Sequence, residues 1–239
     1  AENGHTYPGA TSPFGLIQAS PETGNDGWKY CSGFNLSDDS IIGFAQTHLS
    51  GTGGPGLGDI LLLPFSHDKN SFPYKTKYEK DSQVATAGYY SVVLPDENIQ
   101  AEMTTTQRTA FYRFIYKASD EPRQLLLDLQ NGIAGWGKNV NQLVLSATMQ
   151  TPDANTITGY NDIEAWVHRR CFYAIEFDKP FQTKKSLPKQ PDQKAERLVL
   201  SFDTDTLLVK VGLSTVSVEG ALQSLKKENS QWNFDNVRN

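Results

Sequence analysis

The sequence predicts an all-β protein of antiparallel strands, arranged as a sandwich or a barrel, with a short helical segment at its carboxyl end. Apolar runs of about five to eight residues recur at roughly ten-residue intervals, with turn-forming residues between them. Residues 99–106 alternate strictly: Ile99, Ala101 and Met103 fall on one face and polar residues on the other, as in a half-buried strand. Strands do not alternate with helical segments, which argues against a parallel sheet.

The expected strands follow one another through most of the chain. They occupy residues 14–19, 41–44, 60–63, 89–94, 99–106, 110–116, 124–129, 143–149, 156–160, 171–177, 197–202 and 207–213. Pro13 and Pro21 bound the first of them. Residues 66–80 and 179–196 are polar and lack periodicity, so we expect connections there. The second is interpreted as an exposed hairpin loop, with a basic contact surface as the alternative.

The carboxyl end changes from strand to helix. Val218, Ala221 and Leu225 follow the spacing of a helix face, and Ser217 can cap that helix. Asp235 resembles the cap of a second helix. We therefore expect the all-β part of the chain to end shortly before Val218.

Composition narrows the class of protein. The 239 residues carry a net charge of −5, which gives no basic footprint for nucleic acid. No apolar run approaches the roughly 20 residues that a membrane helix needs. Cys31 and Cys171 follow no metal-binding spacing, and whether they pair is left open. Residues 1–5 have neither a charged start nor an apolar segment, so we expect no signal peptide in this chain and expect that any export signal has been removed.

A glycine-rich segment, residues 51–58, joins the expected strands at 41–44 and 60–63. Glycine adopts backbone conformations that other residues avoid and lets a ligand approach closely. Beside His48, this segment favours one wall of a binding site. Residues 51–56 formally match the dinucleotide pattern G-x-G-x-x-G. A strand follows where that fold requires a helix, which excludes the nucleotide interpretation.

Several multi-residue motifs occur in a fixed order near the start of the chain. They are His5–Gly15, Tyr30–Phe34, Ile41–Phe44, Thr47–Gly53 and Gly58–Leu62. In this order they resemble the amino-terminal domain of the glycoside hydrolase family 92 α-mannosidases, and weaker similarity extends over nearly the whole chain. The resemblance implies a large antiparallel β-sandwich, a supersandwich of the galactose-mutarotase-like type, over residues 1–216. Residues 217–239 would then begin a helical linker.

The resemblance also implies an activity. Members of the family are calcium-dependent, inverting, exo-acting α-mannosidases that trim mannose from glycans. Their two catalytic carboxylates and main calcium contacts come from an (α/α)6 helical domain, whose motifs are absent here. We therefore expect no catalytic residue and no metal ligand in this chain, and calcium only in the full-length enzyme. The expected partners are mannose-containing glycans and that helical domain, and the expected location is periplasmic, extracellular or at the cell surface.

The candidate substrate-binding residues lie in or beside the matched motifs. They are His5, Trp28, Tyr30, Cys31, His48 and Thr52. Trp28 could offer its flat indole face to a pyranose ring, or pack in the core with its N–H paired. His5 and His48 could hydrogen-bond sugar hydroxyls, or brace the glycine-rich segment. Both interpretations stay open for each residue.

Three further tryptophans lie outside these motifs. Trp136 is flanked by glycines and is a candidate for a second exposed aromatic contact, whereas Trp166 and Trp232 are expected to pack. Two other functions remain as alternatives: a stand-alone carbohydrate-binding module with sugar affinity of its own, and a docking scaffold with a large apolar patch. Were the chain active by itself, its carboxylate pair would be sought among Glu22, Asp26, Asp38, Asp39 and Asp59.

Overall fold

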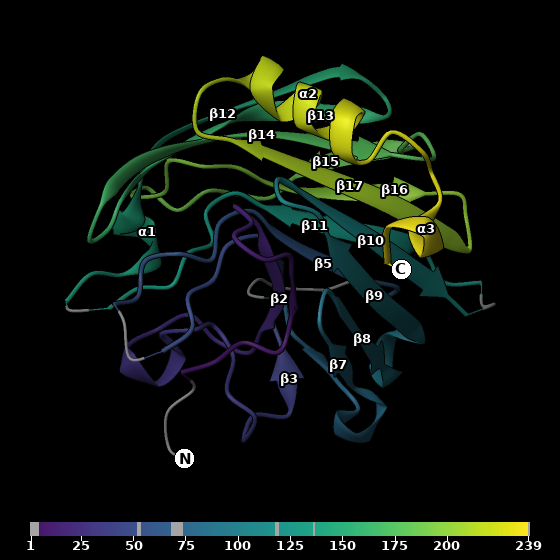
Figure 1. Ribbon diagram of the computed structural model, residues 1–239, viewed down its shortest axis with the longest axis horizontal. Helices are drawn as coiled ribbons and strands as arrows, with labels where there is room; N and C mark the ends of the chain where they lie inside the picture. The colour runs from purple at the N-terminus through teal and green to yellow at the C-terminus, as the bar shows by residue number, and fades with distance from the viewer. Residues whose placement is uncertain (1–4, 52–53, 68–73, 118–119, 136, 239) are drawn as a thin grey trace.

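Two large antiparallel sheets lie face to face and form the body of the protein (Figure 1). The computed structural model describes residues 5–51, 54–67, 74–117, 120–135 and 137–238. Every pairing between the strands of these residues is antiparallel. The all-β prediction is confirmed, and the architecture is the sandwich rather than the barrel.

The first sheet has seven strands in the order β1-β2-β4-β5-β11-β16-β15. Their bounds are β1 Ala10–Thr11, β2 Gln18–Glu22, β4 Gly43–Ala45, β5 Leu61–Phe65, β11 Arg123–Asp128, β16 Arg197–Phe202 and β15 Thr183–Ser186. The second sheet has eight strands in the order β12-β13-β14-β17-β10-β9-β8-β7. Their bounds are β12 Val144–Asp153, β13 Thr156–Glu164, β14 His168–Phe177, β17 Thr206–Ser214, β10 Thr109–Tyr116, β9 Ile99–Thr105, β8 Tyr89–Leu94 and β7 Val84–Thr86.

Smaller elements complete the described structure. They are the pair β3 Ser40–Ile41 and β6 Thr76–Lys77, the 3-10 helices η1 Trp28–Tyr30, η2 Lys80–Ser82 and η3 Pro95–Glu97, and the α-helices α1 Val140–Leu143, α2 Val218–Glu228 and α3 Phe234–Arg238. Within the described residues no helix is long and apolar enough to cross a membrane.

The main hydrophobic core fills the space between the two sheets. Leu62, Leu125 and Leu198 enter it from the seven-stranded sheet, and Tyr112 and Val209 enter it from the eight-stranded sheet. All five are at most 1% exposed. Burying one such side chain fully is worth roughly 1.5–3 kcal/mol, so the inner faces contribute strongly to the stability of the sandwich.

The sequence pattern predicts the first strand in the wrong place, at residues 14–19. Strand β2 begins at Gln18 and contains Pro21, whereas Phe14 has φ 57° and a fully exposed side chain. Glu22 directs its carbonyl oxygen toward the β4 side, so the nitrogen of Pro21 points the other way. Strand β1 pairs no further than Ala19 on that side. A residue without an N–H is tolerated there because no neighbouring strand needs one.

Three other expectations for strands and connections change. The run at 41–44 is divided, because Ile41 pairs with Thr76 in the small sheet while β4 belongs to the seven-stranded sheet. Residues 66–80, expected to be a connection, contain β6. Residues 179–196, expected to be a loop, contain β15, which is exposed and pairs with β16 at the edge of the sheet. Edge strands often carry charged side chains, so a search for apolar runs does not recognise them.

Strand β9 is buried on both faces, so the half-buried prediction is wrong. Glu102 and Thr104, on the predicted polar face, are 3% and 1% exposed. The carboxylate of Glu102 accepts hydrogen bonds from Tyr89 and from Arg113. Helix α3 covers this outer face, where Phe234 packs on Tyr89. The alternating pattern of β9 could not reveal this burial, because the helix that covers the polar face comes from the distant end of the chain.

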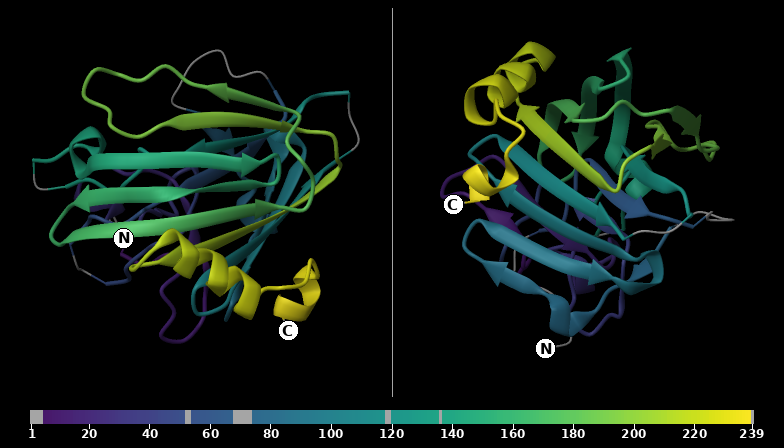
Figure 2. Two further views of the ribbon diagram at one scale, coloured as in Figure 1. Left: turned by 90° about the horizontal axis from the view of Figure 1, so that it is seen from above. Right: turned by 90° about the vertical axis from the view of Figure 1, so that its right-hand side faces the viewer.

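Helix α2 is confirmed together with its cap. The hydroxyl oxygen of Ser217 accepts a hydrogen bond from the N–H of Gly220 at 3.1 Å. Ala221 and Leu225 pack on Ala174 of β14, so the helix lies on the outer face of the eight-stranded sheet (Figure 2).

The cap of helix α3 differs from the prediction. The side-chain oxygen of Asn233 accepts a hydrogen bond from the N–H of Asn236 at 3.1 Å, so Asn233 occupies the capping place. Asp235 lies in the first turn instead and pairs with Arg113 at 3.2 Å. A carboxylate in the first turn also favours the helix through its dipole.

Candidate functional site

Three segments that are separate in the sequence meet in one group of loops. The Nδ1 atom of His5 lies 2.8 Å from the sulfur of Cys31. The His5 ring meets Trp28 edge to face, with ring centroids 5.2 Å apart. Gly51 donates its N–H to the carbonyl oxygen of His5 at 2.6 Å. We call His5, Trp28, Cys31 and Gly51 the loop cluster, and it unites three of the predicted substrate-binding residues.

The short helix η1 carries two of the predicted residues. Gly27 precedes it with φ 70°, a left-handed conformation that glycine adopts without strain. Trp28 is 42% exposed, so part of its indole remains available to a ligand. Tyr30 lines a neighbouring cavity, and the ammonium of Lys29 lies 4.9 Å from its ring centroid. The two aromatic side chains therefore flank η1 with one ring partly open and one facing a hollow.

The side chain of His48 is enclosed rather than open to a ligand. Its Nδ1 donates to the carbonyl oxygen of Gln18 at 2.7 Å, and Tyr7 packs on the ring with centroids 5.4 Å apart. Its Nε2 lies 3.3 Å from Oε1 of Glu22, and neither side chain is exposed. This contact lacks good hydrogen-bond geometry. We call these two residues the Glu22–His48 pair, and in this position His48 braces the loops.

A third residue holds the Glu22–His48 pair in place. The amide nitrogen of Asn131 donates to Oε2 of Glu22 at 2.9 Å and to the carbonyl oxygen of Gly58 at 2.7 Å. Burial raises the pKa of Glu22 above its usual 4.5, against the lowering effects of His48 and Asn131. The sequence analysis considered Glu22 only as a catalytic carboxylate in case the chain were active by itself, and it missed Asn131. The one local signal was a polar residue soon after a buried strand.

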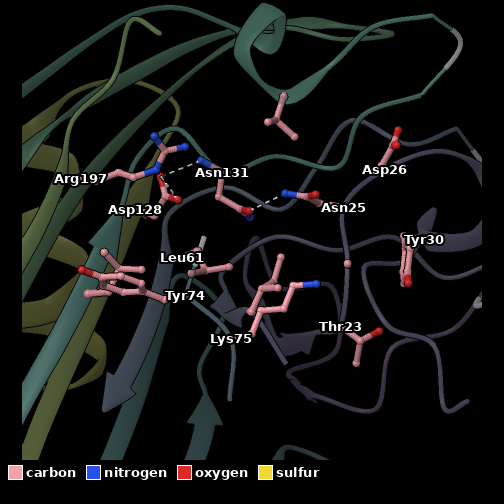
Figure 3. Close-up of a pocket in the computed structure, with 14 residues that line it drawn as sticks. Thr23, Asn25, Asp26, Tyr30, Leu61, Tyr74, Lys75, Asp128, Asn131 and Arg197 are labelled. Carbon is pink, nitrogen blue, oxygen red and sulfur yellow. Dashed lines mark hydrogen bonds and ion pairs between the residues drawn. The ribbon is translucent and has the colours of Figure 1, made fainter. Parts of the chain in front are cut away.

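A cavity of about 350 Å³ lies against the outer side of the seven-stranded sheet (Figure 3). Leu61 and Leu126 form its floor, on the face of β5 and β11 opposite to the main core. Asn25 donates to the side-chain oxygen of Asn131 at 3.1 Å along its polar side, and Tyr30 lies at its margin. An apolar floor with a few polar groups is typical of a small-molecule site.

A buried ion pair fixes the inner end of this cavity. The Nε atom of Arg197 lies 2.8 Å from Oδ2 of Asp128, and both side chains are 6% exposed (Figure 3). The other carboxylate oxygen of Asp128 accepts the N–H groups of Gln130 and Asn131. Asp128 therefore holds the segment that brings Asn131 to Glu22, because one carboxylate caps both backbone donors.

The remaining predicted residues lie apart or outside the described residues. Thr52 and Trp136 fall outside the part of the chain that the structure describes. Trp166, expected to pack, is 58% exposed beside the glycine-rich segment, where a Cβ on Gly56 would meet its ring. Trp232, also expected to pack, is 39% exposed, although its ring centroid lies 3.8 Å from the ammonium of Lys210 and its ring meets Phe111 edge to face.

Among the described residues, no group of three or more histidine, cysteine, aspartate or glutamate side chains could hold a metal ion. The two cysteines are buried and form no disulfide, which answers the question that the sequence left open. Burial raises the pKa of both the Cys31 and the Cys171 thiols, which disfavours the reactive thiolate.

Comparison with known proteins assigns this sandwich and its loops to the amino-terminal domains of a glycosyl hydrolase family. The family described as glycosyl hydrolase family 92 N-terminal domain matches residues 1–214. The chain belongs to this family, and the resemblance carried by the ordered motifs is confirmed.

Solved structures agree with this assignment. The family GH92 α-mannosidase of Bacteroides thetaiotaomicron in complex with mannoimidazole is 29% identical, with a TM-score of 0.88 over 99% of this chain. A family GH92 inverting mannosidase of Bacteroides thetaiotaomicron VPI-5482 is 19% identical with a TM-score of 0.79 over 98% of this chain, and shares the fold. Only 34% and 32% of those chains are matched, so this chain spans about a third of their length.

A curated relative covers a smaller part. An uncharacterized secreted glycosidase of Arthroderma benhamiae is 35% identical over 123 residues, which are 48% of this chain and 16% of that protein. Its name agrees with the hydrolase family and reports secretion for that protein.

Proposed function

We propose that this chain is the non-catalytic sandwich domain of an exported, exo-acting, inverting α-mannosidase that trims mannose from glycans. Family membership and the α-mannosidase among its structural relatives support the activity. The secreted glycosidase among its relatives supports export. The observation that carries the proposal is the loop cluster, because it joins the motifs of the family resemblance and leaves Trp28 partly exposed.

The catalytic groups belong to another part of the enzyme. Inversion needs an acid and a base carboxyl group roughly 6.5–9.5 Å apart, on opposite sides of the sugar. We assign neither to this chain, and we place both, with the calcium ion, in an (α/α)6 domain of a longer chain. Residues 1–216 are then the sandwich domain, and residues 217–239 begin the linker. The chain alone is expected to be inactive.

The loops of this domain would close over the sugar and shape the outer subsites. The indole of Trp28 would stack on a pyranose ring, and His5 would hold that indole and bond a hydroxyl. Tyr30 and Thr52 complete the proposed contact surface, and Cys31, which is buried, supports His5 from behind. His48 keeps its place in the proposed set as the residue that positions the glycine-rich segment, because its ring is enclosed.

A paired assay tests whether the catalytic groups lie outside this chain. Hydrolysis of α-mannosides is measured with calcium for this chain alone and for the longer product of its gene. Activity only in the longer protein supports the proposal. Activity in this chain alone would contradict it and return attention to the carboxylates Glu22, Asp26, Asp38, Asp39 and Asp59.

The role of Trp28 has its own test in the longer protein. Trp28→Ala is expected to lower kcat/KM for α-mannosides at least about tenfold, the loss of a stacking contact worth about 1.4 kcal/mol. Trp232→Ala is the control, since Trp232 is similarly exposed, at 39% against 42%, but packs with α3 on the eight-stranded sheet. Equal losses in both variants would remove Trp28 from the substrate site.

A second candidate is a carbohydrate-binding module that acts without a catalytic domain. The cavity beside Tyr30 favours it, because a preformed hollow with amide groups at its side can hold a small ligand without any partner. Calorimetry with mannose and short mannosides tests this chain alone. Affinity that Tyr30→Ala abolishes supports the module, because Tyr30 lines the cavity, and no measurable heat excludes it.

A further inference from the structure

Trp166 lies at the tip of the hairpin that joins β13 to β14, and the proposed function gives it no role. Trp166 is 58% exposed, and the next residue, Val167, is 47% exposed. Single exposed apolar residues are common and need no explanation. The case for a site at Trp166 therefore depends on how its ring is held and on which groups surround it.

The glycine-rich segment holds one edge of the indole. A Cβ on Gly56 would lie 3.0 Å from Cδ1 of Trp166 and 2.7 Å from Cβ of Ala165, so the hairpin tip and this segment approach closely because Gly56 has no side chain. Arg169 fixes Gly56 in turn, since its Nη2 donates to the carbonyl oxygen of Gly56 at 2.6 Å and pairs with Asp59 at 2.8 Å. The ring is thus positioned at one edge, while more than half of the residue stays open to solvent.

A small hollow with a charged group adjoins the ring. Trp166 lines a hollow of about 80 Å³ together with Pro55, Gly56, Ile133, Gly135, Lys138, Leu143 and Ala165. The ammonium of Lys138 donates to the carbonyl oxygen of Glu164 at 3.4 Å, and this contact engages one of its three donors. A hollow of this size admits a hydroxymethyl group but is too small for a whole pyranose ring. A sugar at this place would therefore lie against the exposed indole and send one substituent into the hollow.

Fixed backbone contacts connect this hollow to the loop cluster. Gly27, which precedes Trp28, donates its N–H to the carbonyl oxygen of Ala134 at 3.0 Å. The next residue, Gly135, packs on Pro55, because a Cβ on Gly135 would lie 2.4 Å from Cγ of Pro55. Pro55 in turn precedes the glycine that holds the indole. The segments that carry the two exposed tryptophans are therefore joined, so a ligand chain bound at one can continue toward the other.

The chemistry of this place suits a sugar. A pyranose ring has an apolar face that can stack on an indole, and its hydroxyl groups can accept from an ammonium such as that of Lys138. Trp28 is not among the residues that line the hollow at Trp166, so one sugar ring would not contact both tryptophans. A chain of several sugars can contact both.

We propose that Trp166 and Lys138 form a second sugar-binding platform, which holds an outer residue of a long or branched mannose-containing glycan. Trp28 then holds a sugar nearer to the bond that is cleaved. The two platforms together would make the enzyme prefer extended glycans over short α-mannosides. This inference rests on the proposed function and names the class of substrate for it.

Kinetics with a short and a long substrate test the platform in the longer gene product. Trp166→Ala should lower kcat/KM for a branched α-mannan at least about threefold, mainly through KM, because an outer contact is made equally in the ground state and the transition state. For an aryl α-mannoside the same variant should stay within about twofold of wild type, because that substrate cannot reach Trp166. Equal losses on both substrates would show that Trp166 supports folding or contacts another domain, and would overturn the proposal.

Affinity electrophoresis tests binding without catalysis. This chain is run in gels with and without the same α-mannan, and wild type should be retarded by the polysaccharide. Trp166→Ala should weaken the retardation at least about threefold, whereas Trp166→Phe should keep most of it, because phenylalanine retains an aromatic face. Val167→Ala is the matched control, since Val167 is exposed in the same turn but has no flat ring. Absence of retardation in wild type, or equal retardation of wild type and Trp166→Ala, overturns the platform.

The outcomes distinguish this inference from the proposed function. Retardation that depends on Trp166, found with a longer protein that lacks α-mannosidase activity, keeps the platform and overturns the activity. An active longer protein in which Trp166→Ala matches wild type on both substrates keeps the activity and overturns the platform.

Discussion

The Nε2 atom of His48 lies 3.3 Å from Oε1 of Glu22, in a place where neither side chain reaches solvent. The pair joins strand β2 to the loop after β4, and Asn131 ties Glu22 and the carbonyl of Gly58 to the segment after β11. Three stretches of chain therefore share one buried polar contact. Breaking a buried polar network is costly, because the remaining partner keeps its desolvation penalty.

Glu22→Gln should change how stability depends on pH. Burial raises the pKa of Glu22, so the folded state holds its proton more tightly than the unfolded state does. The stabilisation from this proton is complete below the unfolded pKa and is lost as pH rises through the folded pKa. Glutamine cannot titrate, so its variant lacks this loss. Urea unfolding between about pH 4 and pH 8 should show the free energy of unfolding of the wild type falling relative to that of Glu22→Gln as the pH rises. Parallel curves would show that Glu22 does not titrate in this window.

Gly33→Ala should loosen the same region. A Cβ there would lie 2.9 Å from Cγ of Glu22 and 3.1 Å from Cδ2 of His48, and φ is 79°. Strain of about 1–2 kcal/mol and overpacking of about 1–3 kcal/mol should add to a loss of roughly 2–5 kcal/mol. Gly88→Ala is the control, with φ 75° and no atom within 4 Å, so it carries the strain alone. Chemical denaturation measures both, and equal losses would place Gly33 outside the packed pair.

Asp128→Ala should be among the most destabilising single changes in the seven-stranded sheet. It would leave Arg197 buried without its carboxylate and two backbone N–H groups without their acceptor. Breaking such a buried pair costs about 3–5 kcal/mol. Asp205→Ala removes the acceptor of Arg123 from a pair whose side chains are 63% and 24% exposed, and should cost at most about 1 kcal/mol. Similar unfolding midpoints for both variants would contradict the structure.

Both cysteines should be alkylated after unfolding without any reductant. Neither forms a disulfide, and Cys31 and Cys171 are only 4% and 8% exposed. In the native protein, alkylation near neutral pH should be at least about tenfold slower than after unfolding, because it requires local opening and a disfavoured thiolate. Mass spectrometry counts the modified residues. A missing label in the unreduced, unfolded protein would reveal a disulfide.

Local pattern is enough for elements whose stability is decided within a few residues. Strand β8 has the predicted bounds because Pro95 ends an apolar run, and β16 has them because its run is compact. The cap of α2 follows from Ser217 and the helical spacing behind it. Prediction fails where a neighbour decides, as at Pro21, which is tolerated in β2 only because β1 ends before it.

The sequence by itself therefore determined the all-β class, most strands, the helix at Val218 and, through ordered motifs, the family. Only the tertiary structure decided the site. His5 meets Cys31 across 26 positions, and Glu22 meets Asn131 across 109. Periodicity and capping report on neighbours within one turn or one strand, whereas the burial of Glu22 and the exposure of Phe14 depend on which distant segments cover them, or leave them open.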